Sequence, residues 1–248
     1  LDVGQGLSAV VQTQHHTLVF DTGPKFSESF NTGTAIVKPF IQSQGIKHID
    51  TLIVSHADND HIGGAVPLIK EIKTTTILSS TPHLLPNAAP CKDGQSWQWD
   101  SVDFSIIHPA ITDNGSENNL SCVLKVSNTS GSILLTGDIE KEAEQLLVER
   151  YSTKLNSTVL IAPHHGSKTS SSLAFINAVS PKLSLFPVGY RNRYHFPNTE
   201  VIHRYERNDI QILNTAKEGA ISIKFGTKMM SRPITYRQSH HKIWTSDE

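Results

Sequence analysis

Ser55-His56-Ala57-Asp58-Asn59-Asp60-His61-Ile62-Gly63-Gly64 directly follows the apolar run 51–54, which predicts a short buried strand ending in a polar loop. Four potential metal ligands fall within six residues of this stretch: His56, Asp58, Asp60 and His61. Imidazole and carboxylate ligands without cysteine suit a divalent ion such as zinc or manganese. The alternative is a solvated loop in which Asp60 caps the next helix, but the number of ligand-capable side chains favours a metal.

Two further apolar runs end in ligand-capable side chains. The run 134–136 is followed by Gly137-Asp138, which is either an ordinary turn or the source of a bridging carboxylate. The run 159–162 leads into Pro163-His164-His165-Gly166-Ser167. Adjacent histidines point in different directions, so we expect one to ligate and the other to contact substrate or pack. Ligands from three strand ends suit a two-metal hydrolase, in which the ions lie ~3.5–4 Å apart.

A fourth polar segment is Asn192-Arg193-Tyr194-His195-Phe196-Pro197. Taken alone it is a loop, but its imidazole, aromatic rings and arginine are useful against a phosphate backbone and stacked bases. We expect four catalytic residues, Asp58, Asp60, Lys168 and His195. Asp58 or Asp60 would orient a water molecule, and His195 with Lys168 or Arg193 would hold the phosphate or protonate the leaving oxygen.

The rest of the chain predicts one domain, residues 1–230, followed by a polar tail, residues 231–248. The pattern predicts a hairpin from residues 10–11 and 17–20, and then alternating helices and strands. Further strands are expected at 51–54, 74–78, 102–107, 122–126, 132–136, 158–162 and 183–186, helices at 35–41, 65–69, 140–150 and 170–179, and an irregular loop at 81–100. This order indicates two sheets with helices on their outer faces.

Composition narrows the function only in part. Net charge is −1 over 248 residues, but residues 1–150 carry 9 Lys+Arg against 17 Asp+Glu, and residues 151–248 carry 13 against 6. An acidic half suits metal cations and a basic half suits a polyanion, although both are also compatible with ordinary solvated surface. Gly4-Gln5-Gly6 lacks the spacing of a phosphate-binding or dinucleotide motif, so no nucleotide cofactor is expected.

Compartment and chain boundaries are less determined by the sequence. Cys91 and Cys122 show no metal or redox spacing and are either one disulfide or two separate thiols. No apolar run reaches the ~18 residues of a membrane-spanning helix, and no signal segment is visible. The chain begins on Leu1-Asp2-Val3, typical of the start of a strand, and we therefore expect it to be part of a longer protein.

Taken together, these motifs resemble the metallo-β-lactamase superfamily, through Asp21-Thr22-Gly23, the 56–61 loop, Gly137-Asp138 and the later histidine. Within it, the chain resembles the soluble C-terminal domain of the ComEC family of competence (DNA-uptake) proteins. That resemblance rests on four segments: Leu1-Asp2-Val3-Gly4-Gln5-Gly6, His61-Ile62-Gly63-Gly64, Pro163-His164-His165-Gly166-Ser167-Lys168-Thr169-Ser170 and Asn192-Arg193-Tyr194-His195.

The resemblance implies an α/β fold of four layers, αββα, with the metal site at one edge of the sheets. It also implies a parent inner-membrane protein that passes single-stranded DNA into the cell. This domain would lie on the extracytoplasmic, periplasmic face and degrade the strand left outside. Its partners would then be single-stranded DNA and the membrane-embedded channel portion of the same protein.

The sequence departs from the superfamily pattern at two places. The usual first motif is His-x-His-x-Asp-His, and here Asp58 replaces the second histidine. An oxygen ligand there favours a harder ion, manganese rather than zinc, or a weaker site. Where a middle histidine ligand is usual, the chain has Asn118, Asn119 and Ser121.

The expected activity is metal-dependent phosphodiester hydrolysis with one or two divalent ions. One ion would be held by Asp60, His61, Asp138 and either His164 or His165, and a second by His56 and Asp58. Two alternatives stay open. A small-ester, lactone or thioester hydrolase would show an apolar pocket and no basic groove, whereas a catalytically weak DNA-guiding module would fold well without metal.

Overall fold

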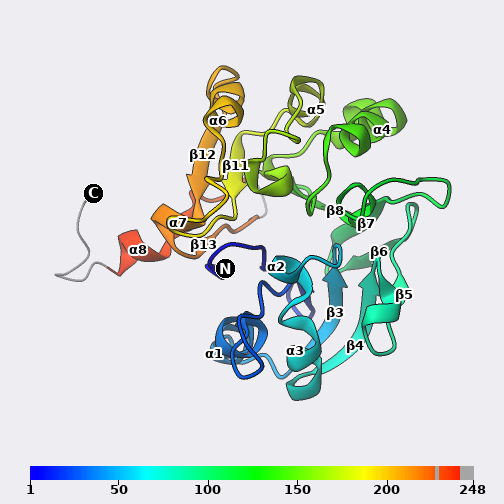
Figure 1. Cartoon of the computed structure of the whole chain (residues 1–248), viewed down its shortest axis with the longest axis vertical. Coiled ribbons are helices and arrows are strands. Elements are labelled where there is room, and N and C mark those ends of the chain that lie inside the picture. Colours follow the sequence, from blue (N-terminus) through cyan, green and yellow to red (C-terminus); the bar gives the residue numbers. More distant parts are fainter. Residues whose placement is uncertain (227–228, 241–248) are drawn as a thin grey trace.

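Two large β-sheets lie face to face with helices on their outer sides (Figure 1). The computed structural model describes residues 1–226 and 229–240. The first sheet has the order β1-β2-β3-β4-β5, with β1 Ala9–Gln12, β2 Thr17–Phe20, β3 His48–Val54, β4 Lys73–Ser79 and β5 Ala89–Pro90. Its strands are parallel except for the antiparallel β1–β2 hairpin.

The second sheet has the order β12-β11-β10-β9-β8-β7-β6. Its strands are β6 Ser96–Trp99, β7 Val102–His108, β8 Val123–Asn128, β9 Gly131–Leu135, β10 Val159–Ile161, β11 Leu183–Phe186 and β12 Gln211–Asn214. Strands β6 to β9 form an antiparallel meander, and β9 to β12 run parallel. A small third sheet pairs β13 Ile221–Ser222 with β14 Ile234–Thr235.

Eight α-helices are described, and most connect strands. They are α1 Lys38–Ser43, α2 Asn59–Ile62, α3 Ala65–Glu71, α4 Lys141–Tyr151, α5 Leu173–Val179, α6 Thr199–Glu206, α7 Thr215–Glu218 and α8 Tyr236–Ser239. A π-helical turn, Gly33–Val37, leads into α1. Short 3₁₀ turns occur at Pro82–Leu84, Asn118–Leu120, Ser152–Leu155 and Pro163–Gly166. None of the helices in the described residues combines the length and apolar character that crossing a bilayer requires.

The strands divide their apolar side chains between three cores because successive residues of a strand face opposite sides of the sheet. In β9, Leu134 packs under the outer helices and Leu135 packs between the sheets. In β2, Val19 faces α1 and α3, whereas Phe20 faces the second sheet. One core therefore lies between the sheets, one beneath α4, α5 and α6, and one beneath α1 and α3. The four-layer αββα prediction is confirmed.

The irregular loop predicted for residues 81–100 is wrong in part, because the segment contributes β5 and β6. Strand β6 pairs antiparallel with β7, placing Trp97 opposite Phe104. The Trp97 and Phe104 rings stack with their centroids 5.2 Å apart. The alternation in Ser96-Trp97-Gln98-Trp99 carries the strand signal that the surrounding Pro, Asn and Gly residues obscured.

Cys91 and Cys122 form a disulfide with a Cα–Cα separation of 6.1 Å. Cys91 directly follows β5 of the first sheet, and Cys122 directly precedes β8 of the second. Both residues are buried in the core between the sheets. The bond therefore ties the two sheets together covalently, which decides between the two alternatives left open by the spacing.

Part of the predicted polar tail is ordered. Strand β14 and helix α8 lie within residues 231–240, and α8 is at the C-terminal end of the ribbon in Figure 1. Residues 241–248 of that predicted tail lie outside the described residues, and the division at residue 230 stays a prediction.

Candidate metal centre

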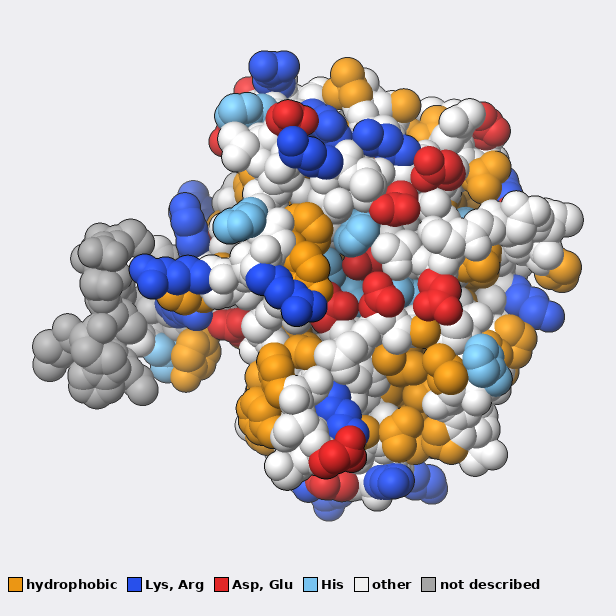
Figure 2. Space-filling model, viewed as in Figure 1, with side chains coloured by type: hydrophobic (Ala, Val, Ile, Leu, Met, Phe, Trp, Pro, Cys, Tyr) orange, Lys and Arg blue, Asp and Glu red, His pale blue; other side chains and the backbone are white. Residues whose placement is uncertain are grey.

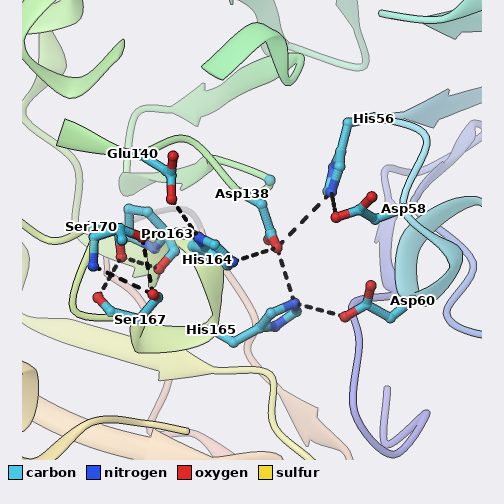
Figure 3. A network of polar contacts seen from close by, with 12 residues as sticks. His56, Asp58, Asp60, Asp138, Glu140, Pro163, His164, His165, Ser167 and Ser170 are labelled. Atoms are coloured by element: carbon cyan, nitrogen blue, oxygen red, sulfur yellow. Dashed lines mark hydrogen bonds and ion pairs between the residues drawn. The ribbon is translucent and has the colours of Figure 1, made fainter. Parts of the chain in front are cut away.

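Three strand ends meet at one edge of the two sheets. Strand β3 leads into the loop of His56 and then into α2, β9 leads into Asp138, and β10 leads into His164 and His165. Strands β9 and β10 are parallel neighbours in the second sheet, and β3 belongs to the facing sheet. Carboxyl ends of parallel strands share an edge, so segments more than 100 residues apart converge there. Figure 3 shows side chains of these segments pointing toward Asp138.

His61 has a fixed orientation. It is fully buried, and its Nδ1 lies 2.7 Å from Asp21 Oδ2. A carboxylate oxygen only accepts, so Nδ1 carries the hydrogen and donates it. The opposite nitrogen, Nε2, then faces Asp138 Oδ1 at 3.1 Å. A hydrogen bond from the second ring nitrogen to a carboxylate commonly orients metal-binding histidines in proteins.

His165 is oriented in the same way by the backbone. Its Nδ1 donates to the Pro187 carbonyl at 2.8 Å. Its Nε2 lies 3.2 Å from Asp60 Oδ2, 3.4 Å from Asp138 Oδ2 and 3.1 Å from His61 Nε2. With both Nδ1 atoms protonated, the neutral rings of His61 and His165 direct two lone pairs into one space. Two lone pairs that face each other repel, and a cation between them removes this repulsion.

His56 provides a test of whether the residues fit a metal. Its side chain is fully buried, and Nε2 has no hydrogen-bond partner among the described residues. The nearest carboxylate oxygens are Asp58 Oδ2 at 3.5 Å and Asp138 Oδ2 at 4.0 Å. A buried nitrogen without a partner is costly, whereas the same nitrogen facing two carboxylates is what a divalent ion requires. The residues therefore fit a metal.

Charge in the cluster is strongly coupled. Burial disfavours the charged form of His61, but the carboxylates of Asp138 and Asp21 raise its pKa well above the usual value. Burial likewise opposes protonation of His165, and Asp138 and Asp60 raise its pKa to about 9. The pKa of Asp138 is held well below its usual value, against the effect of burial, by His165 and His61. Asp138 is therefore ionised, and without a metal the pair formed by His61 and His165 retains a proton.

Two overlapping ligand sets follow from the geometry. The potential ligand atoms of Asp60, His61 and His165 lie within 4.8 Å of one another, as do those of His56, His61 and Asp138. Asp138 is within 4.0 Å of all four histidines, which places it between the two sets. Asp58 is the most exposed predicted ligand, at 52% of its side chain.

His164 is placed differently from its neighbour. Its Nε2 is 3.8 Å from Asp138 Oδ2, and its Nδ1 is 3.3 Å from Glu140 Oε1. The ring also lies 3.3 Å from Thr169 Oγ1 and is partly exposed. The geometry thus favours His165 as the ligand of the pair and leaves His164 at the edge of the cluster, as drawn in Figure 3.

The backbone is strained where these side chains are presented. Gly137, His164 and His165 all have positive φ, at 55°, 47° and 54°. A side chain on Gly137 would lie 2.8 Å from Ser55 Cβ and 2.9 Å from Ser121 Cβ. Left-handed backbone at non-glycine residues costs energy and is concentrated at functional sites. Here it turns two consecutive imidazoles out of the end of β10.

The predicted catalytic residues Lys168 and His195 are not joined to this cluster. The exposed Lys168 pairs with Glu200 at 3.5 Å. The exposed His195 ends a loop whose next residue, Phe196, contacts both His164 and His165. Among residues 1–226 and 229–240, no hydrogen bond or ion pair links either side chain to a candidate ligand. Their catalytic roles stay predictions, as do those of Asp58 and Asp60.

The residues that replace the usual middle ligand have structural tasks. Asn119 accepts from Glu140 N and donates to Glu142 at the start of α4. Ser121 Oγ accepts from Asp138 N at 3.2 Å.

Three supporting groups were not assigned roles from the sequence. Asp21 was visible only as part of a family motif, and Glu140 only as the start of a helix. The Pro187 carbonyl has no sequence signal at all. Asp21 also accepts from Ser55 N at 2.6 Å and Ser55 Oγ at 2.7 Å, so it fixes the first residue of the ligand loop as well as His61.

Comparison with known proteins agrees with this geometry. The sequence profile of the metallo-beta-lactamase superfamily matches residues 1–189. The chain belongs to this superfamily. Membership implies a divalent metal ion at the centre, and together with the candidate ligand sets it supports a metal-dependent hydrolase.

The predicted resemblance of this metallo-β-lactamase domain to competence proteins is also confirmed. The chain is 39% identical over 225 residues to "Competence protein ComA" of Neisseria gonorrhoeae, and the match covers 91% of this chain and 32% of that protein. It is 32% identical over 256 residues to "ComE operon protein 3" of Bacillus subtilis, covering 92% and 33%. It is 34% identical over 227 residues to "Recombination protein 2" of Haemophilus influenzae, covering 91% and 28%. The chain thus spans about a third of the length of these relatives.

Solved structures share the fold of the metallo-β-lactamase domain. A putative metal-dependent hydrolase from Parabacteroides distasonis aligns with a TM-score of 0.57 at 13% identity, covering 86% of this chain and 90% of that one. The metallo-beta-lactamase fold protein YhfI of Bacillus subtilis aligns with a TM-score of 0.55 at 12% identity, covering 85% and 88%.

Proposed function

We propose that this domain is a metal-dependent phosphodiesterase that cleaves single-stranded DNA. Within a longer parent protein it would degrade the strand that is not imported during DNA uptake. The observation that carries the hydrolytic part is the ring of buried imidazole nitrogens around Asp138, which includes the unpartnered Nε2 of His56. The names of the relatives, competence and recombination proteins, support DNA as the substrate.

Asp60, His61, His165 and Asp138 would hold one ion, and His56 with Asp58 and Asp138 would hold a second. The ion supplies Lewis acidity, polarising a phosphoryl oxygen and making water a better nucleophile near neutral pH. Asp58, with its exposed oxygen, favours manganese over zinc at the second position. His164, held by Glu140, lies at the edge of the cluster, where a substrate phosphate or its leaving oxygen would pass.

The charge distribution supports a polyanionic substrate. Residues 151–248 hold 13 Lys+Arg against 6 Asp+Glu, and the second half of the chain forms one wall of the site. Figure 2 shows acidic and histidine side chains gathered near the middle of one face, with Lys and Arg side chains beside them. Fixed positive charge next to a metal site attracts a phosphate backbone and raises its local concentration.

The small-ester alternative has a weaker basis. A cavity of about 710 Å³ is lined by β1, the 220–226 segment and the inner face of the second sheet. None of the candidate metal ligands lines it. An apolar substrate held there would not reach the metal centre.

The proposal is tested with end-labelled single-stranded DNA incubated with the domain and added manganese or zinc. Asp138→Asn removes the carboxylate charge that lies between the two ligand sets, and Asp103→Asn changes an exposed carboxylate on β7 as the matched control. We expect cleavage by the parent and the control, none by Asp138→Asn, and loss of cleavage in chelator. Circular dichroism establishes that each variant is folded.

The opposite results are equally informative. Equal cleavage by parent and Asp138→Asn would point to a contaminating nuclease and overturn the proposal. Tight DNA binding without cleavage by the metal-loaded parent would support a DNA-guiding module. Hydrolysis of lactones or thioesters, but not of DNA, would support the small-ester alternative.

The disulfide supports an extracytoplasmic location for the domain. Disulfides persist in oxidising compartments such as the bacterial periplasm and are rare in the cytosol. We propose that the domain works on the periplasmic face of the inner membrane, beside the membrane-embedded channel portion of the same protein. Thiol labelling of Cys91 and Cys122 after acid quenching and denaturation of cells tests this location, because label that enters only after reduction shows that the bond is formed in the cell.

A further inference from the structure

A continuous series of rings leads from the surface to the candidate metal centre. Tyr194 stacks on Phe196 with the ring centroids 5.5 Å apart and the planes at 17°. Phe196 in turn stacks on His165 at 6.4 Å and 23°, and meets the edge of His164 at 5.8 Å. His165 faces Asp60 and Asp138. A flat group placed on this series would therefore lie directly beside the metal ligands.

The loop that carries these rings is held in one conformation. Asn192 Oδ1 accepts from Phe196 N at 2.9 Å, and Asn192 Nδ2 donates to Phe196 O at 2.7 Å and to Gly189 O at 3.1 Å. Gly189 packs against the backbone of Gln5, where an added Cβ would lie 2.5 Å from the nitrogen. The loop thus presents its rings without needing to be ordered by a ligand.

The outer end of the series is exposed and accompanied by guanidinium groups. Tyr190 is 69% exposed and Tyr194 48%. The Arg191 guanidinium lies 5.1 Å above the Tyr190 ring, and that of Arg193 lies 4.8 Å above the Tyr194 ring. Arg193 also donates to Tyr194 Oη at 2.6 Å. These pairs repeat one unit, an exposed aromatic ring with an exposed cation beside it.

Such a unit matches a nucleotide with an unpaired base. Every base has a flat face that stacks on aromatic side chains whatever its sequence, and arginine binds the adjoining phosphate. Both arginines are exposed, so each can leave the ring for a phosphate while a base takes its place. In a duplex the base faces are covered by their stacked neighbours and cannot be shared in this way. A loop with these groups would favour single strands over a duplex.

We propose that Tyr194, stacked on Phe196 and flanked by Arg193, forms a base-stacking subsite for the nucleotide next to the phosphate at the metal centre. Tyr190 with Arg191 provides a second position farther from the centre. This inference rests on the proposed function in that it names the part of the same site that selects unpaired nucleotides. Tyr194 is a specificity-determining residue and has no part in the chemical step.

A binding experiment without metal tests the subsite independently of cleavage. Fluorescence anisotropy in chelator compares a labelled single-stranded oligonucleotide with the same strand carrying abasic sites throughout. We expect the parent to bind the base-bearing strand on the order of tenfold more tightly than the abasic strand. Tyr194→Ala should lose most of that preference and Tyr194→Phe should keep it, because stacking needs the ring and not the hydroxyl. Tyr236→Ala, an exposed tyrosine of α8, is the matched control.

The inference is overturned if the parent binds both strands equally, or if Tyr194→Ala weakens binding to both by the same factor. The second result would mean a general structural effect of the substitution. These outcomes differ from failure of the proposed function, which is an inactive metal-loaded parent. In an active enzyme, Tyr194→Ala should raise KM for single-stranded DNA with little change in kcat, and should leave cleavage of the abasic strand unchanged.

Discussion

Asp21 Oδ2 lies 2.7 Å from Nδ1 of His61, and both side chains are fully buried. The same carboxylate accepts from the backbone and the hydroxyl of Ser55. Asp21 follows β2 and His61 lies in α2, so this contact joins two strand ends of the first sheet. A residue that contacts no substrate thus determines the direction in which a candidate ligand points.

Replacing Asp21 should weaken metal binding without abolishing folding. In Asp21→Asn the side chain is neutral, so it stabilises the orientation and basicity of His61 less well. Loss of such outer support typically costs ~10–100-fold in metal affinity. Competition with a chromophoric chelator measures the affinity. Asp50→Asn, which alters a carboxylate that accepts from Thr17 N at 2.8 Å in the same sheet, is the control and should bind metal as the parent does. Unchanged affinity in Asp21→Asn would contradict the role.

Replacing each of the two adjacent histidines should have a different effect on the metal content of the protein. His165→Ala should lose at least one bound ion per chain, because Nε2 of His165 faces both Asp60 and Asp138. His164→Ala should retain its metal, because His164 pairs with Glu140 at the edge of the cluster. It should lose activity, because a substrate phosphate or its leaving oxygen would pass this edge. Elemental analysis after dialysis measures the stoichiometry. Loss of metal in His164→Ala but not in His165→Ala would reverse the assignment.

Metal binding should release protons at neutral pH. The pKa of His165 is raised to about 9 and that of His61 lies well above its usual value, so the pair formed by these two rings holds at least one extra proton in the metal-free protein at pH 7. An ion must displace that proton, and affinity should therefore rise with pH until about pH 9. Titration calorimetry at pH 7 in two buffers of different ionisation enthalpy gives the number of protons released. Identical heats in the two buffers would show that none is displaced.

Breaking the disulfide should destabilise the fold. The bond closes a loop with a sequence separation of 31, for which chain entropy predicts roughly 3–4 kcal/mol. Urea unfolding should show this loss in the Cys91→Ala/Cys122→Ala variant and in the reduced parent. The reduced parent controls for the packing change at the two alanines. A parent whose unfolding midpoint is unaffected by reduction would show that the bond contributes nothing to stability.

The strand ends of the candidate site were predictable because their signal is local. An apolar run followed at once by histidine or aspartate marks the end of a buried strand, and this identified His56, Asp58, Asp60, His61, Asp138, His164 and His165. The layered architecture followed from the same patterns. Strand β6 was missed because its short alternation is surrounded by loop-forming residues, and its partner β7 stabilises it by pairing.

Contacts across the sheets were not predictable. The choice between His164 and His165 depends on their backbone dihedral angles and on the Pro187 carbonyl, 22 residues away. The expected role of Lys168 was drawn from its charge, but in the structure the side chain pairs with Glu200 on α6. Neither contact can be predicted from a single stretch of sequence, because its two partners come from different segments.

The sequence by itself determined the family, the layers and the residue types available at each strand end, because these depend on periodicity and on short motifs. Only the tertiary structure decided which nitrogen of each imidazole faces Asp138, that Cys91 pairs with Cys122, and that Tyr194 stacks toward the centre through Phe196. The physical reason is that orientation at the site comes from buried hydrogen bonds and ring contacts between segments that only folding brings together.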